Sequence, residues 1–211
     1  MTVTPELLLE AYRAGVFPMA EHRDDPDVFW VDPRKRGVFP LDGFHISRSL
    51  AKVLRRNDYD VTRNACFGEV IDACADRAET WINTDIRLLY EELHYRGHAH
   101  SVEVWSDARL IGGIYGVTIG GAFCGESMFS RERNGSKIAL AWLIDLLVRG
   151  GYVLFDTQFL TPHLASLGAI EIPRASYRQQ LSAALKINAD LGSVPLAESG
   201  HDVVQRNTQT S

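Results

Sequence analysis

The chain has 211 residues, of which 45% are hydrophobic and 23% are charged, and its formal net charge is -5. This composition is typical of a globular protein with one large domain or a main domain and a small appendage, and the net charge gives no sign of a nucleic-acid ligand. No run of about 18 apolar residues predicts a membrane span, and the first six residues do not resemble a signal peptide. The three cysteines form no Cys-x-x-Cys pair, which favours reduced core residues in a cytoplasmic protein.

Residues 1–43 predict a small, irregular N-terminal unit. Thr4 and Pro5 suit the N-cap and first turn of a helix, and Gly15 suits its end. The stretch 16–43 then mixes aromatic residues, prolines and charges, with many turn signals. Helices are next predicted over residues 47–56, 67–78 and 84–97.

Residues 44–190 predict the main domain, in which three strands with hairpin-length connections follow the helices. These strands cover residues 101–105, 110–119 and 122–129. A helix then runs to the Gly150-Gly151 stop, and a strand over 152–156 and helices over 163–167 and 175–185 follow. Residues 191–211 are polar, and we expect a disordered tail there.

The order of the elements indicates an α+β fold. Helices, an antiparallel meander, a helix and a returning strand resemble the acyltransferase fold of the GNAT class. Those enzymes hold the coenzyme A pyrophosphate on a glycine-rich turn at a helix N-terminus. The corresponding turn here, residues 131–136, has one glycine and an added carboxylate. An acyl-coenzyme A donor is therefore disfavoured, and another activated acyl group is implied.

Two strands that look buried each end in polar residues. One leads to Glu126, and the other leads to Asp156 and Gln158. A charge at the end of an apolar strand is costly unless it is paired or used, so we expect a site at one edge of the sheet. Asp156 and Gln158 are two residues apart, and we expect them to point to the same side and to form a hydrogen-bonded pair.

The helix over residues 47–56 carries a one-sided basic stripe. Its cations recur at i, i+4, i+7 and i+8 and therefore share one helix face: Arg48, Lys52, Arg55 and Arg56. Such a stripe can bind a phosphate backbone even on an acidic protein. The alternative is an ordinary solvated helix face.

Many motifs, in the right order over residues 6–180, resemble those of the leucyl/phenylalanyl-tRNA–protein transferases. They lie at 12–19, 32–34, 44–50, 80–82, 97–105, 112–117, 125–130, 156–158, 163–169 and 172–174. The resemblance implies a monomeric bacterial enzyme of the N-degron pathway that needs neither metal nor organic cofactor. It transfers Leu or Phe, and less readily Met, from aminoacyl-tRNA to proteins that begin with Arg or Lys. The product is a new peptide bond and a destabilising N-terminus.

The resemblance implies that Asp156 and Gln158 take the proton of the amine, but an amide is too weak a base to store a proton. The chemistry of the residues gives other roles: Glu126 would hold the cationic N-terminus of the acceptor, Gln158 would aim the amine, and Asp156 would stabilise the developing ammonium. The basic stripe would dock the acceptor stem. The donor side-chain pocket would be lined by Met19, Trp81, Tyr90, Phe123, Leu143 and Phe155, and Met19 stands where other family members carry Trp.

Three other hypotheses compete with this one. The first is an N-acyltransferase that uses aminoacyl-tRNA but acts on a small-molecule or cell-wall acceptor. The second is an RNA-binding module without catalysis. The third is a metal site formed by His94, His98 and His100, which is disfavoured because Gly97 interrupts their helix.

Overall fold

The computed structural model describes residues 3–25 and 27–209. Its strands are β1 (Phe17–Met19), β2 (Phe29–Val31), β3 (Lys35–Phe39), β4 (Asp60–Arg63), β5 (Ala99–Ser106), β6 (Arg109–Ile119), β7 (Ala122–Ser130), β8 (Leu154–Gln158) and β9 (Ile170–Pro173). Seven of them form one sheet in the order β4-β5-β6-β7-β8-β3-β9, and β1 pairs with β2 apart from it. Neighbours in the large sheet are antiparallel, except that β7 and β8 are parallel.

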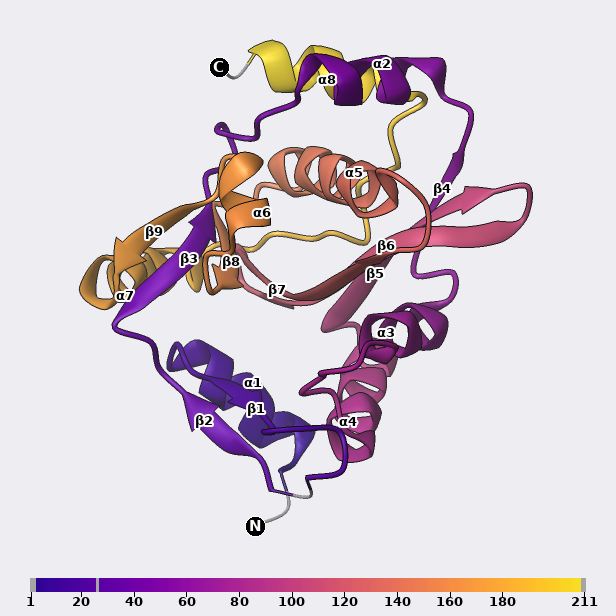
Figure 1. Ribbon diagram of the computed structural model, residues 1–211. Coiled ribbons are helices and arrows are strands. Elements are labelled where there is room, and N and C mark those ends of the chain that lie inside the picture. The colour runs from indigo at the N-terminus through magenta and orange to yellow at the C-terminus, as the bar shows by residue number, and fades with distance from the viewer. Residues whose placement is uncertain (1–2, 26, 210–211) are drawn as a thin grey trace.

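Helices cover both faces of this sheet (Figure 1). They are α1 (Pro5–Arg13), α2 (Arg48–Arg56), α3 (Phe67–Ala75), α4 (Thr84–Tyr95), α5 (Gly135–Arg149), α6 (Pro162–Ser166), α7 (Arg174–Ala184) and α8 (Gly200–Gln209). Figure 1 shows α2, α5 and α8 on one side, and α1, α3 and α4 on the other. The expected α+β architecture with an N-terminal unit is confirmed. None of the helices in the described part of the chain has the length and apolar content needed to cross a membrane.

Local sequence explains where several helices begin. The side chains of Thr4, Ser47 and Asn83 accept hydrogen bonds from the backbone N–H groups of the first turns of α1, α2 and α4. These contacts satisfy donors that a helix start otherwise leaves unpaired. The predicted helices over 47–56 and 84–97 are therefore confirmed to within two residues.

The two faces of the sheet bury separate apolar clusters. The α5 core lies under α5 and includes Phe123 and Phe155, whereas the α4 core lies under α1, α3 and α4 and includes Tyr12 and Tyr90. Helix α5 starts so close to the sheet that a Cβ on Gly135 would lie 2.4 Å from the Ile111 carbonyl oxygen. Only glycine allows this approach.

The parallel strands β7 and β8 separate after a short paired stretch. Their last paired residues are Cys124 and Asp156. Glu126 and Gln158 follow two residues later, one on each strand, and we call the opening between them the splay. Glu126 is also the extra residue of a β-bulge, since Gly125 and Ser127 pair with consecutive residues of β6. Bulges of this kind redirect a side chain.

Two predictions about the domains need correction. Strand β3 lies within the predicted N-terminal unit 1–43, but it pairs between β8 and β9 in the main sheet. The disordered tail predicted for 191–211 is wrong for residues 200–209, which form α8. Val203 and Val204 of this helix are each only 2% exposed. Two apolar residues among polar ones give a weak sequence signal, and packing against the rest of the fold stabilises the helix.

Candidate active site

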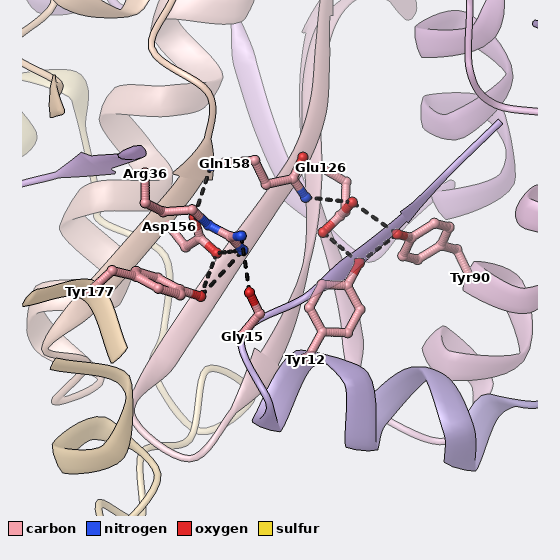
Figure 2. Close-up of polar contacts among 8 residues, drawn as sticks. All are labelled: Tyr12, Gly15, Arg36, Tyr90, Glu126, Asp156, Gln158 and Tyr177. Carbon is pink, nitrogen blue, oxygen red and sulfur yellow. Dashed lines mark hydrogen bonds and ion pairs between the residues drawn. The ribbon is translucent and has the colours of Figure 1, made fainter. Parts of the chain in front are cut away.

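Glu126 is the centre of a buried hydrogen-bond network in the splay (Figure 2). Its side chain accepts hydrogen bonds from the hydroxyls of Tyr12 (2.7 Å) and Tyr90 (2.8 Å) and from Nε2 of Gln158 (2.9 Å). Helix α1 supplies Tyr12, helix α4 supplies Tyr90, and β8 supplies Gln158. The carboxylate therefore joins the N-terminal unit to both parallel strands.

The environment of Glu126 favours its protonated form. Burial raises the pKa of Glu126 from 4.5 to about 7, and the three hydrogen bonds limit the rise. A carboxyl group with this pKa changes its charge near neutral pH. A strongly perturbed carboxyl group in a cleft is a candidate acid or base.

Asp156 and Gln158 do not form the side-chain pair that we expected. The Asp156 carboxylate accepts instead from the backbone N–H of Gln158, at 2.8 Å, while the Gln158 side chain reaches Glu126. The reason is the backbone of Gln158, whose φ of 63° is left-handed and breaks the alternation of the strand. Such a conformation is unusual for a residue with a side chain and often marks a functional site.

Arg36 is the buried partner of Asp156, and sequence reasoning missed it. Its Nε and Nη2 donate to the two carboxylate oxygens of Asp156 at 2.8 and 2.6 Å, and the exposed fractions of these side chains are 1% and 0%. Tyr177 donates a further hydrogen bond to Asp156, and Arg36 also donates to the Gly15 carbonyl at the end of α1. Arg36 follows Arg34 and Lys35 directly, so in the sequence it resembles part of a solvated basic run.

The charges of this pair stabilise each other. Burial by itself lowers the pKa of Arg36, but the hydrogen bond and the charge of Asp156 raise it above its usual range. A buried charge is stable only when it is paired and hydrogen-bonded, as both groups are here. The negative charge of Asp156 is therefore already balanced within the protein.

The six predicted pocket residues fall into two groups on opposite faces of the sheet. Phe123, Leu143 and Phe155 are closely packed in the α5 core. The other three surround the α4 core, where the Trp81 and Tyr90 rings make an edge-on contact. The structure thus does not bring all six into one lining.

A cavity of about 410 Å³ opens at the outer half of β7. It is bounded by β7, the first turn of α5, the end of α3, and α6, through Ala73, Asp76, Arg77, Met128, Phe129, Ser130, Arg131, Ser136 and His163. Arg77 donates a hydrogen bond to the hydroxyl of Ser127, the residue next to Glu126 in the sequence. The side chains that line this cavity do not include Glu126, Asp156 or Gln158.

The predicted basic stripe is fully displayed on α2. Its four side chains are exposed, and α2 contains no acidic residue: Arg48, Lys52, Arg55 and Arg56. Asp58, just beyond the helix, pairs with Arg56. The stripe lies on the α5 side of the sheet, whereas Glu126 contacts α1 and α4 on the opposite side (Figures 1 and 2).

Two of the three histidines considered as metal ligands have other side-chain neighbours. His94 stacks on Phe67, and its Nδ1 lies 2.8 Å from the Ala99 carbonyl oxygen. Nδ1 of His100 lies 3.0 Å from the side-chain amide of Asn64. Within residues 3–25 and 27–209, no group of three or more His, Cys, Asp or Glu side chains is arranged to hold a metal ion.

The chain is similar to known proteins over its whole length. The family model for leucyl/phenylalanyl-tRNA protein transferase matches residues 38–182, and the model for the N-terminal domain of that family matches residues 1–34. The leucyl/phenylalanyl-tRNA–protein transferase of Ruegeria pomeroyi is 62% identical over 211 residues, which are 100% of both chains. That of Cereibacter sphaeroides strain ATCC 17025 is 61% identical over 209 residues, 99% of this chain and 98% of the relative.

A solved structure supports the fold independently. The crystal structure of FemX superposes with a TM-score of 0.55 at 12% sequence identity. The match covers 79% of this chain and 66% of the FemX chain, slightly less than two thirds of it. Identity this low shows a shared fold alone, whereas the family models and the relatives cover nearly every residue. The chain belongs to the leucyl/phenylalanyl-tRNA–protein transferase family.

Proposed function

We propose that this protein transfers leucine or phenylalanine, and less readily methionine, from aminoacyl-tRNA to the α-amine of proteins that begin with Arg or Lys. Membership of the family gives the reaction. The observation in this chain that best supports the proposal is the hydrogen bond between Gln158 and Glu126 across the splay. That contact brings a titratable carboxylate and an amide together where β7 and β8 separate.

The reaction is the aminolysis of an activated ester. The amine nitrogen attacks the ester carbonyl carbon, a C–N bond forms, and the C–O bond to the ribose breaks. The amine loses one proton and the ribose oxygen gains one. The ester is already activated, so the protein mainly has to position two substrates and to accept a proton from the amine.

Glu126 is our candidate for the proton acceptor. Its pKa of about 7 lies close to the reference pKa of an α-amine, about 7.7–8.0, so proton transfer between them is nearly balanced. The hydrogen-bond network can also stabilise both the ionised and the protonated form of Glu126. Ionised Glu126 accepts hydrogen bonds from both phenols, whereas protonated Glu126 can donate to one phenol, which then donates to the other across the close contact between Tyr12 and Tyr90.

Gln158 and Asp156 have different roles in this proposal. Nε2 of Gln158 donates to Glu126, so its carbonyl oxygen is left to accept an N–H of the incoming amine. Asp156 is fully buried and paired with Arg36, and it holds the backbone of Gln158. We therefore assign Asp156 a positioning role in place of the direct charge stabilisation expected from its sequence position.

The donor, an aminoacyl-tRNA, would be bound by a pocket for its aminoacyl side chain and by the basic stripe of α2. We place the pocket of the aminoacyl side chain on the α4 side of the sheet, around Met19, Trp81 and Tyr90, because Tyr90 contacts both Glu126 and the Trp81 ring. Phe123, Leu143 and Phe155 are packed in the α5 core and would support the sheet from its other face. A shaped apolar pocket distinguishes Leu from Val or Ile by about 1–3 kcal/mol per methylene-sized difference. The basic stripe of α2 would bind the phosphates of the acceptor stem, and such contacts do not read sequence. We place this reaction in the cytoplasm.

A transfer assay tests the proposal. Labelled leucine is supplied as Leu-tRNA to two peptides that differ only in beginning with Arg or with Ala. We expect label on the Arg peptide alone and its loss in Glu126→Ala and Gln158→Ala. Transfer to an amino-sugar or cell-wall peptide in place of the Arg peptide would favour the alternative N-acyltransferase. Binding of tRNA without transfer to any acceptor would contradict both hypotheses.

A further inference from the structure

The C-terminal helix α8 lies directly against the basic helix α2. Figure 1 shows both helices side by side above α5. Helix α2 packs mainly on α8, and α8 in turn packs on α5. The two buried valines of α8, Val203 and Val204, share the α5 core with Leu50 and Leu54 of α2. The apolar side of α2 is therefore covered largely by a segment outside the region that the family model matches, residues 38–182.

Polar contacts fix where α8 begins relative to the end of α2. Asn57 is the left-handed C-cap of α2, with a φ of 53°, and its Oδ1 accepts a hydrogen bond of 2.8 Å from the backbone N–H of Gly200. A Cβ at Gly200 would lie only 2.2 Å from the Leu54 carbonyl oxygen. The start of α8 thus touches the last turn of α2 without an intervening side chain.

Other contacts hold α8 and the segment before it to the rest of the fold. Arg206 of α8 donates to the buried carboxylate of Asp145 in α5 at 2.5 Å. Nη1 of Arg63 in β4 donates to the Leu191 and Val194 carbonyls at 2.5 and 2.6 Å. Helix α8 is therefore held by α5 on one side and offers a fixed surface to α2 on the other.

We propose that α8 is a positioning element for the donor tRNA: it sets the orientation of α2 and so directs the four exposed cations of the stripe at the phosphates of the acceptor stem. The proposal rests on the function proposed above, in which α2 docks the tRNA. The residues that act through α2 are Asn57, at its C-cap, and Val203, beneath it. Neither touches the reacting atoms.

Two variants of the full chain loosen the packing of α8 on α2. Asn57→Gly keeps a residue that tolerates the left-handed backbone but removes the acceptor of the Gly200 N–H. Val203→Asn acts more strongly, because it places a polar group in the α5 core. The matched control is Asn64→Gly, since Asn64 also has a left-handed φ, of 59°, and a side-chain oxygen that accepts a backbone N–H, but its side chain contacts Ser101 and His100 of β5.

Each protein is assayed with two donors, full-length Leu-tRNA and the leucyl ester of adenosine, which has no acceptor stem. With Leu-tRNA, we expect Asn57→Gly and Val203→Asn to raise KM by roughly tenfold or more, the change that corresponds to one charge-assisted hydrogen bond. The slope of log affinity against log salt should become shallower by roughly 0.7–0.9 for each phosphate that the variant no longer binds. With the adenosine ester, kcat/KM of both variants should stay within about twofold of that of the control Asn64→Gly, because small changes in stability have little effect on turnover.

Three results would overturn the proposal in distinguishable ways. An unchanged KM for Leu-tRNA in both variants would show that α8 does not position α2. An equal loss with both donors would show that α8 supports the fold in general. The third result concerns the proposed docking itself: if a variant with all four stripe residues changed to Gln keeps its KM for Leu-tRNA, α2 is not the docking surface, and both the docking and the role of α8 fall.

Discussion

Replacing Glu126 by glutamine should make the stability of the protein less dependent on pH. The folded state raises the pKa of Glu126 from 4.5 to about 7, so between these values the folded state binds more protons than the unfolded state. The sign follows from linkage: stability is highest below pH 4.5, falls as the pH rises towards 7, and then levels off. A glutamine side chain cannot ionise, so Glu126→Gln lacks this contribution.

The two pKa values set the size of the effect. Ionising the buried carboxyl group costs about 1 kcal/mol of stability at pH 5 and about 3 kcal/mol at pH 8. The stability of Glu126→Gln relative to the parent should therefore improve by about 2–3 kcal/mol from pH 5 to pH 8. For a chain of this length, that corresponds to a relative shift in melting temperature of about 5–10 °C.

Urea unfolding of both proteins at pH 5, 6, 7 and 8 measures this difference. Titrations that the two proteins share cancel when their free energies of unfolding are subtracted. The reasoning is refuted if the difference changes by less than about 0.5 kcal/mol over this range, an allowance based on the uncertainty of extrapolated free energies. In that case the Glu126 carboxyl group would not be protonated near neutral pH, and its role as proton acceptor would lose its basis.

Four further variants test the network around it. Arg36→Met leaves the charge of Asp156 buried without its partner, so calorimetry should show a loss of about 3–5 kcal/mol. Adding Asp156→Asn to that variant should restore part of this stability. Tyr90→Phe removes a hydrogen bond that lowers the pKa of Glu126. The rising limb of the pH–rate profile should therefore shift to higher pH by roughly one pH unit. Gln158→Glu places a second carboxylate beside Glu126, and kcat measured with Leu-tRNA should fall sharply despite the added basicity; unchanged turnover would contradict the positioning of the amine by the amide.

Much of the local structure could be read from the sequence. Helix starts at Thr4, Ser47 and Asn83 depend on side chains that bond to the adjacent turn. The long strands of the meander are apolar enough to be recognised without their partners. Short strands such as β3 and β9 were missed because their pairing depends on residues far away in the chain.

The candidate site was only partly predictable for the same reason. The sequence pointed to Glu126, Asp156 and Gln158, because polar groups after apolar strands are conspicuous. It gave no indication that Arg36 neutralises Asp156, since 120 positions separate the two residues. Nor could it show the left-handed backbone of Gln158, which turns its side chain away from Asp156.

The sequence by itself determined the family, the α+β class, the helix ends and the basic stripe, since motifs, apolar periodicity and local hydrogen bonds involve residues close together in the chain. The tertiary structure alone decided the surroundings of the two carboxylates. Burial and the Tyr12, Tyr90 and Gln158 contacts bring the pKa of Glu126 to about 7, while an arginine from another strand pairs with Asp156. Only the structure showed that part of the C-terminal segment is helical, because a polar helix with two valines is stable only where a complementary surface covers those valines.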